Sequence, residues 1–454
     1  MGKHDEALHP DQRISAVGAG LKCCAEYGLV VAAESQKIPL GVMALFASKF
    51  CVTIAIGIQV TIVGKQVWDL SGSKWQLGLI GLTEFVPTAL LSPFTGAFAD
   101  RYDRRKVLAA GLLGELVAAF LLFAYATTDP TTVFPIYGFV LIFGIARAFV
   151  APPSRALPFD LAPDQLIERV AAINALTFQI ALIIGPVIGG FLYVVSPAHP
   201  YLFATIMIVI GIAVLAFVPY SPREVLHSAS GVKATLVDAR EGLRFVRRTP
   251  VLFGAISLDL FAVLFGGAVA LLPAIAEERL GVGAIGLGWL RAATGMGAAS
   301  VSLALAAKPV SRHLGRVLLV AVAVFGLATI VLGLTTSFTV AFIALLILSG
   351  SDSISMFIRS AIVPMATPES MRGRVLATEN VFIGASNELG AFESGVAASL
   401  IGLVGAVVFG GAATLAVVVL WWRFFPALRL IDRFSELKPV SVAPDVLNPV
   451  RESQ

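Results

Sequence analysis

The stretch Gly96–Lys106, reading Gly-Ala-Phe-Ala-Asp-Arg-Tyr-Asp-Arg-Arg-Lys, is a dense block of charge between two apolar segments. These segments, Trp75–Phe98 and Val107–Ala126, each have about the twenty residues that an α-helix needs to cross a bilayer. A charged block alone would fit any solvated surface, but this block is flanked by two membrane-length segments. The stretch therefore predicts a short loop between two transmembrane helices.

The composition agrees with a membrane protein. Of the 454 residues, 57% are hydrophobic and 14% are charged, and the mean hydropathy is +0.88. A soluble protein of this length would not tolerate such a composition. The net charge of +4 is too small to indicate a nucleic-acid partner. The cysteines Cys23, Cys24 and Cys51 show neither metal-binding nor disulfide spacing, and residues 1–38 contain no apolar core of a cleavable signal peptide.

Twelve apolar runs predict an all-α integral membrane protein with two six-helix bundles. The expected spans are 41–66, 75–98, 106–126, 133–153, 170–195 and 201–219, then 251–276, 284–307, 316–334, 338–363, 376–401 and 403–425. The corresponding division is an N-terminal extension (1–38), a first bundle (39–220), a linker (221–250), a second bundle (251–425) and a tail (426–454).

Three segments outside the spans carry separate structural predictions. The linker is polar and basic, and it predicts a short amphipathic helix near Lys233–Arg247. Segment 14–33 contains Lys22 and Glu26, which favour a surface helix over a thirteenth span. The tail from Pro426 onward is polar, and we expect it to be poorly ordered.

Positive charge alternates between the connections. Those before the first span and after every second span hold most of the Lys and Arg, such as Arg372 and Arg374, whereas the opposite connections hold little. By the positive-inside rule, both termini, the extension, the linker and the tail are expected to be cytoplasmic.

The two halves also repeat. Gly185…Gly190 recurs as Gly390…Gly395 at a shift of 205 residues, which predicts a parallel repeat of two six-helix units.

Charged residues inside the predicted spans are candidates for function, because each costs roughly 2.5–3.5 kcal/mol at a helix centre. They are Glu84, Glu115, Arg147, Asp259, Arg291, Asp352, Glu388 and Glu393. Most should face a cavity or a partner, either as proton-titrating and substrate-orienting groups or as interhelical ion pairs such as Asp259 with Arg291. Lys49 and Lys65 lie near helix ends, where they can snorkel.

Two carboxylates are the candidates for a site that binds and releases a coupling proton, because such a site needs a titrating carboxylate in apolar surroundings. Asp259 lies within the seventh span, and Glu393, ranked slightly ahead, lies within the eleventh. Arg147 in the first bundle could pair with a carboxylate and release it on protonation.

The eleventh span carries a polar stripe. Glu379, Ser386, Gly390 and Glu393 fall on one side, with Asn387 and Ser394 at its margin and Glu388 opposite. Such a stripe should line the central cavity or pack on another helix, and the cavity is favoured. Ser386, Asn387, Gly390, Arg291 and Asp352 are therefore the expected cavity lining.

The charged block also predicts a conformational latch. Asp100 lies at the cytoplasmic end of the second helix, where the repeat brings the start of the eleventh helix close. A carboxylate near that helix's N-terminus would hold the cytoplasmic side closed. Gly96 would permit the contact, and Arg101, Arg104 and Arg105 flank it as a topology signal.

No energy-coupling enzyme site is visible. The Gly64-Lys65 pair lacks the first Gly and the hydroxyl of a phosphate-binding loop, and the five histidines have no metal-binding spacing. We expect no enzyme activity, no cofactor and no metal, which leaves an ion gradient or simple facilitation as the energy source.

The charged block resembles the signature Gly-x-Leu-Ala-Asp-Arg-x-Gly-Arg-Arg/Lys of the major facilitator superfamily, with Phe98 and Asp103 as departures. Gly185-Pro186-Val187-Ile188-Gly189-Gly190 resembles the Gly-Pro-x-x-Gly-Gly motif of its antiporters, which is associated with export. Ala181 replaces that motif's earlier Gly. The physical content of the motif is close helix packing.

Over about residues 40–430 the chain looks like the enterobactin-exporter-like branch, beside the macrolide-efflux proteins in the third drug:proton antiporter group. Matching segments include Trp68–Ser73, Leu258–Ala262, Met371–Val375 and Ser386–Gly390. The resemblance implies a bacterial inner-membrane exporter driven by proton antiport. We expect an amphipathic drug or siderophore as its substrate and a monomer as its working state. A lysophospholipid flippase or importer, or a non-transporting receptor of the same fold, remains as an alternative.

Overall fold

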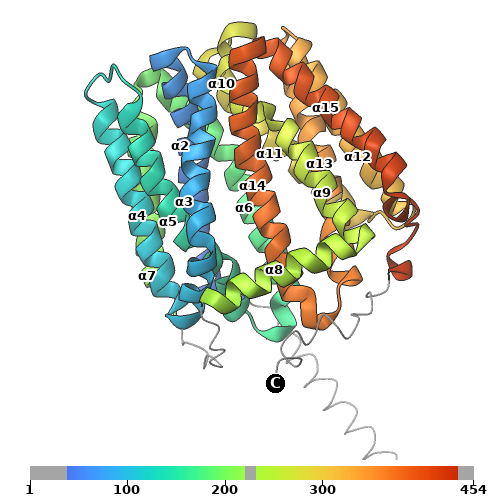
Figure 1. Cartoon of the computed structure of the whole chain (residues 1–454). Coiled ribbons are helices and arrows are strands. Elements are labelled where there is room, and N and C mark those ends of the chain that lie inside the picture. Colours follow the sequence, from blue (N-terminus) through green and yellow to red (C-terminus); the bar gives the residue numbers. More distant parts are fainter. Residues whose placement is uncertain (1–37, 220–231, 438–454) are drawn as a thin grey trace, which may run out of the picture.

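The computed structural model describes residues 38–219 and 232–437 (Figure 1), without the side chains of Ser92, Pro93, Ala97, Asp100 and residues 232–239. These ranges are helical and contain no strand. The extension with its predicted surface helix at 14–33, part of the linker and the end of the tail lie outside the described residues.

The first six-helix bundle is formed by the long helices before the linker. They are α2 (Leu40–Ser71), α3 (Lys74–Arg101), α4 (Arg104–Ala126), α5 (Phe134–Asp160), α6 (Ile167–Val195) and α7 (His199–Ala216), with the short 3₁₀ turn η1 (Asp164–Leu166) before α6. All six predicted spans of this half fall on these helices.

The second bundle repeats this plan. Its first spanning element comprises α9 (Pro250–Phe265), η2 (Gly267–Leu271), α10 (Leu272–Ala274) and the π-helical turn η3 (Ile275–Arg279). The other helices are α11 (Gly283–Ala307), α12 (Leu314–Leu334), α13 (Phe338–Ala366), α14 (Glu369–Ile401) and α15 (Leu403–Phe424). Across the described residues the twelve predicted spans are therefore present in two groups of six.

The prediction of an unbroken helix over 251–276 is wrong. The α-helix stops at Gly266-Gly267 and resumes only after a 3₁₀ segment. A Cβ at Gly266 would lie 2.3 Å from the Phe325 ring, and one at Gly267 would lie 2.3 Å from the Gly390 carbonyl oxygen. Two consecutive glycines weaken a helix and allow this close approach, so the break follows from local sequence and packing together.

Ten spans, with α9 to η3 counted as one, are long and apolar enough to cross a membrane within the described residues. The other two long helices, α3 and α14, are more polar. Both lie at the boundary between the bundles, where a helix faces protein and a cavity as well as lipid. Large apolar side chains are exposed on the outer surface, for example Phe120 at 54% and Val419 at 68%, as expected for helices that face lipid.

The charged block serves two purposes in the fold. It ends α3 at Arg101, and its Asp103 caps α4 by accepting hydrogen bonds from the backbone N–H groups of Arg105 (2.9 Å) and Lys106 (3.3 Å). Capping satisfies donors that the first helical turn leaves unpaired. Asp103 is one of the two residues that depart from the signature, and the cap accounts for a carboxylate at this position.

The predicted linker helix is confirmed as α8 (Val232–Arg248), which crosses the lower end of the bundles in Figure 1. It packs on α14, where Arg374 pairs with Glu241 at 2.7 Å, and it also contacts α3. We call this end of the molecule the α8 end and the opposite end the α10 end.

The expectation of a poorly ordered tail is wrong for its first part. Residues 426–437 include the helical turn α16 (Pro426–Arg429) and the 3₁₀ turn η4 (Phe434–Glu436). Leu428 is fully buried in the apolar cluster under α12 and α15. Phe434 stacks edge-on against Phe357, so apolar side chains hold a segment that composition alone marks as polar.

Candidate functional site

A cavity of about 360 Å³ lies between the two bundles. Its wall comes from α2, α3 and α5 of the first bundle and from α9, η2, α11, α12, α13 and α14 of the second. The break after α9 contributes Gly266 and Gly267, so irregular backbone occurs where it lines a cavity. The charged lining residues are Glu84, Arg147, Arg291, Asp352 and Glu388.

Two of these charges form a pair within the first bundle. Arg147 Nε lies 3.5 Å from the Glu84 carboxylate, so Arg147 does pair with a carboxylate. One of its terminal nitrogens, Nη1, is buried without a hydrogen-bond partner among the described residues.

The second bundle contributes charges that have no such pairing. Within the described part of the chain, Arg291 and Glu388 make neither a side-chain hydrogen bond nor an ion pair, and Arg291 Nε is buried. A buried charged donor without a partner costs free energy. Both side chains line the cavity, so a polar ligand there would satisfy them.

The prediction that the stripe on α14 faces the cavity is wrong for most of its members. Ser386 and Gly390 pack inside the second bundle, and a Cβ at Gly390 would lie 2.8 Å from the Val263 carbonyl oxygen on α9. The cavity is lined instead by Asn387 at the margin of the stripe and by Ala391 and Glu388, which lie beyond it. Small polar residues and glycines are also what close helix packing requires, and this role decides the orientation of α14.

The glycines of the α6 motif make two kinds of contact. Gly185 faces α2, where an added Cβ would lie 2.8 Å from the Ile54 carbonyl oxygen, and Gly189 faces the same helix. Gly190 faces α11 of the other bundle, where an added Cβ would lie 2.5 Å from the Ala284 carbonyl oxygen. Pro186 is buried, and its carbonyl oxygen would lie 2.6 Å from a Cβ at Gly288, so the motif holds α6 against both bundles.

The repeat of this motif on α14 makes the equivalent contacts. Gly390 faces α9 of its own bundle, as Gly185 faces α2. Gly395 faces α3 of the other bundle, just as Gly190 faces α11. A Cβ added at Gly395 would lie 2.6 Å from Gly78 Cα. The two halves are thus related by the parallel repeat that the sequence predicts.

Ion pairs join the bundles at the α10 end. Lys65 on α2 lies 2.9 Å from Glu277 on η3 and also pairs with Asp69. Lys74 on α3 lies 2.7 Å from Glu278. The expectation that Lys65 snorkels is wrong, because its side chain is 8% exposed and is held by these two carboxylates.

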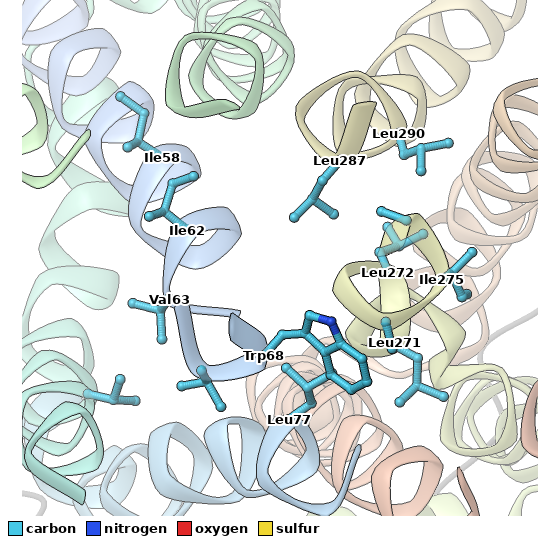
Figure 2. Close-up of a cluster of buried hydrophobic side chains, with 14 of the residues drawn as sticks. Ile58, Ile62, Val63, Trp68, Leu77, Leu271, Leu272, Ile275, Leu287 and Leu290 are labelled. Carbon is cyan, nitrogen blue, oxygen red and sulfur yellow. The ribbon is translucent and has the colours of Figure 1, made fainter. Parts of the chain in front are cut away.

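The same elements also contribute to an apolar cluster (Figure 2). It brings Trp68 of α2 and Leu77 of α3 together with Leu271, Leu272 and Ile275 of the broken seventh span. Side chains from both bundles thus form one buried core at this end, and Leu77 of this core also lines the cavity.

The α8 end is bridged differently. Arg155 on α5 donates a hydrogen bond of 3.3 Å to Asn380 on α14, and α8 spans α3 and α14. A Cβ at Gly96 would have no atom within 4 Å, so no close contact is made on that side of this glycine in the present conformation. The side chain of Asp100, the predicted latch, lies outside the described residues.

The arginines of the charged block hold the first bundle. Arg104 pairs with Asp160 on α5 at 2.8 Å, and Arg105 donates a 2.6 Å hydrogen bond to the Val218 carbonyl oxygen. Arg101 is exposed.

A second group of charges is buried within the second bundle. Asp259 on α9 pairs with Arg359 on α13 at 2.8 Å, and Arg359 lies 3.9 Å from Glu379 on α14. The sequence suggested an ion pair between Asp259 and Arg291, but the structure does not contain it. Arg359 was missed by sequence reasoning, although it lies about two helical turns after Asp352 and therefore on the same face.

The remaining charges lie elsewhere. Glu393 is half-buried, and its carboxylate accepts a hydrogen bond of 3.5 Å from Ser394 without lining the cavity. Glu115 on α4 is fully buried without a hydrogen-bond partner. Lys49 is held by the Ser154 carbonyl oxygen and by Asn174 on α6. The described residues hold no group of three or more His, Cys, Asp or Glu side chains that could bind a metal ion.

A family model described as transmembrane secretion effector, from the major facilitator superfamily, matches residues 44–445. The chain belongs to this family. It is similar to Enterobactin exporter EntS of Escherichia coli O81 (strain ED1a), with 26% identity over 419 residues that cover 88% of this chain and 95% of the relative. The same exporter from Escherichia coli (strain SMS-3-5 / SECEC) is 25% identical with the same coverage.

Solved transporters share the fold. The nucleoside transporter NupG superposes with a TM-score of 0.67 at 12% identity, covering 85% of this chain and 100% of that chain. A D-xylose-proton symporter superposes with a TM-score of 0.67 at 13% identity, covering 85% and 98%. These structures show the fold, and the family match and the exporter relatives make the protein a multi-pass transporter of the bacterial inner membrane that carries a small molecule and is not an enzyme.

Proposed function

We propose that the protein exports an amphipathic small molecule of the siderophore or drug class in exchange for protons, by alternating access of the cavity between the bundles. The observation that carries this proposal is the pair of opposite charges on the wall of that cavity, Arg291 and Glu388, neither of which makes a side-chain hydrogen bond or an ion pair with a described residue. A substrate with an anionic group for Arg291 and a hydrogen-bond donor or cationic group for Glu388 would satisfy both.

The direction rests on the family and on charge. The matching family is described as a secretion effector, and the similar relatives are named as exporters of enterobactin. The Lys- and Arg-rich connections lie at the α8 end, so we assign this end to the cytoplasm together with both termini. The α10 end then faces outward, and the conformation described above is the one closed to the outside.

Transport by the full-length protein in liposomes tests this function. With an imposed pH gradient, the proposal expects uphill movement of enterobactin or of a member of a panel of siderophores, macrolides and dyes. Movement that is equally fast with and without the gradient, or movement of lysophospholipid alone, would favour a facilitator or a flippase instead.

A cavity variant gives the test its specificity. Arg291→Gln removes a charge-assisted hydrogen bond of about 1.5–3 kcal/mol, which corresponds to about a 10- to 100-fold loss in affinity for the transported probe. Arg316→Gln is the matched control, because Arg316 is an exposed arginine on α12 that does not line the cavity. Equal affinities of the two variants would contradict a substrate contact at Arg291.

A further inference from the structure

A second, smaller cavity lies beside the first, inside the second bundle. It is lined by Asp259, Ala262 and Val263 of α9, by Val322 and Phe325 of α12, and by Ser351, Asp352 and Ser355 of α13. Its volume of about 10 Å³ is the lower limit for holding one water molecule. Val263, Phe325 and Asp352 line both this cavity and the large one, so Asp352 brings a carboxylate to the wall that the two cavities share.

Two buried polar atoms here lack partners. Ser355 Oγ and Arg359 Nε are buried and make no hydrogen bond with any described residue. The residues are 2% and 4% exposed. Ser355 lines the small cavity together with both aspartates, so a water molecule there would have at least three polar neighbours, which is what ordered buried water requires.

The charged groups around this site come from three helices. Asp259 belongs to α9, Asp352 and Arg359 to α13, and Glu379 to α14. The α12 side is apolar, with Val322 and Phe325. On the α15 side, Thr414 donates a hydrogen bond to the Ala262 carbonyl oxygen. Toward the substrate cavity, Asp352 shares the wall with Arg291 and Glu388.

We infer that Asp352, one water molecule and Asp259 form the proton pathway of the transporter, and that Arg359 is the positioning residue that responds to it. This inference rests on the proposed function. A proton from the substrate cavity binds a carboxylate oxygen of Asp352, which donates it to the water. The water passes a proton to Asp259, and the Asp352 carboxylate is restored.

Protonation of Asp259 weakens its ion pair with Arg359, because one partner loses its charge. The guanidinium keeps its charge and has Glu379 at 3.9 Å as an alternative partner. A shift of Arg359 toward Glu379 changes the contact between α13 and α14. Because α14 also lines the substrate cavity and packs on α3 of the other bundle, the state of Asp259 is transmitted to the substrate site.

A spectroscopic test needs no substrate. Infrared difference spectra of the full-length protein in liposomes, recorded between acidic and alkaline buffer, should contain the carboxylic-acid C=O bands of the two aspartates. Asp352→Asn and Asp259→Asn should each remove one band, and Ser355→Ala should shift both. Glu115→Gln is the matched control, since Glu115 is a fully buried carboxylate in the first bundle, and it should leave these bands in place.

A transport test uses enterobactin as the probe. In Asp352→Asn, which breaks no ion pair seen among the described residues, gradient-driven export should fall at least about tenfold, equivalent to about 1.4 kcal/mol. Exchange of labelled for unlabelled enterobactin should continue, because it needs no net proton movement. Ser355→Ala should slow gradient-driven export while sparing exchange.

Two results would overturn the inference. One is retention of every titrating C=O band in the Asp259→Asn/Asp352→Asn double variant. The other is unchanged gradient-driven export by that variant. If the wild-type protein moves no probe at all, the proposed function fails, and the infrared bands still decide whether these aspartates bind protons through the small cavity.

Discussion

Substitution in the ion pair between Lys65 and Glu277 tests directly how the α10 end is closed. It joins α2 to η3 across the two bundles, and Lys65 has a second partner in Asp69 on its own helix. Glu277→Gln therefore removes the contact between the bundles without leaving the buried ammonium group unpaired. The substitution should favour conformations in which the α10 end is open.

The magnitude follows from the exposure of the two groups. A hydrogen bond to a charged group contributes about 1.5–3 kcal/mol, but solvent screens Glu277, whose side chain is 33% exposed. We therefore expect a loss of about 1–2 kcal/mol, which changes the ratio of closed to open molecules by a factor of about 5–30. Glu278→Gln is the matched control, because the Lys74–Glu278 pair is more exposed and should contribute only about 0.2–1 kcal/mol.

Distances between spin labels at Asp129 and Thr336 report on this equilibrium. Both residues are exposed and lie at the α10 end, one in each bundle. Labelling requires a background in which Cys23, Cys24 and Cys51 are replaced. Glu277→Gln should enlarge the long-distance population clearly, and Glu278→Gln should enlarge it less. An unchanged distribution in Glu277→Gln, or a larger effect of Glu278→Gln, would refute the assignment of this pair as the closing contact.

Four further variants test other contacts. Gly190→Leu should prevent α6 from approaching α11 and abolish transport, whereas Gly138→Leu, where an added Cβ meets nothing within 4 Å, should be tolerated in the same flux assay. Arg359→Met leaves two buried carboxylates without their cation and should destabilise the protein by about 3–5 kcal/mol, seen as a lower melting temperature. Glu393→Gln should retain gradient-driven export if the small cavity carries the proton. Loss of export would instead identify Glu393 as the favoured residue for proton coupling. Asp100→Asn should shift labels across the α8 end toward the open state, by about 0.3–1 kcal/mol if the carboxylate faces a helix N-terminus.

The transmembrane architecture could be predicted from the sequence because its causes are local. Apolar length determines each span, and Asp103 starts α4 by capping it within the same few residues. The repeat at a shift of 205 residues could also be predicted from the sequence, and equivalent glycines make equivalent contacts in the structure. Charged residues within spans were expected to avoid lipid, because placing a charge in the membrane costs free energy. Arg291 and Asp352 do lie on the cavity wall.

The orientation of α14 could not be predicted, because small polar residues suit both a wet cavity and close packing. Only the contact between Gly390 and α9 decides between the two. The partner of Asp259 was equally hidden, since it depends on how α9, α13 and α14 meet. Arg359 drew no attention because it lies near the end of its predicted span, where an arginine can reach the membrane surface. The break after Gly266 combines a weak local signal with contacts from α12 and α14.

The glycine contacts explain how closure can be both tight and reversible. On α6, Gly185 holds the helix to α2 of its own bundle, while Gly190 touches α11 of the other bundle. On α14, Gly390 and Gly395 divide the same two tasks. Contacts between backbones at glycine interlock no side chains, so the surfaces at Gly190 and Gly395 can separate without rotamer changes. Closure at the α10 end must then be secured by the apolar cluster around Trp68 and by ion pairs of modest strength. A transporter that alternates needs this balance, because a contact of much greater strength would hold one conformation permanently.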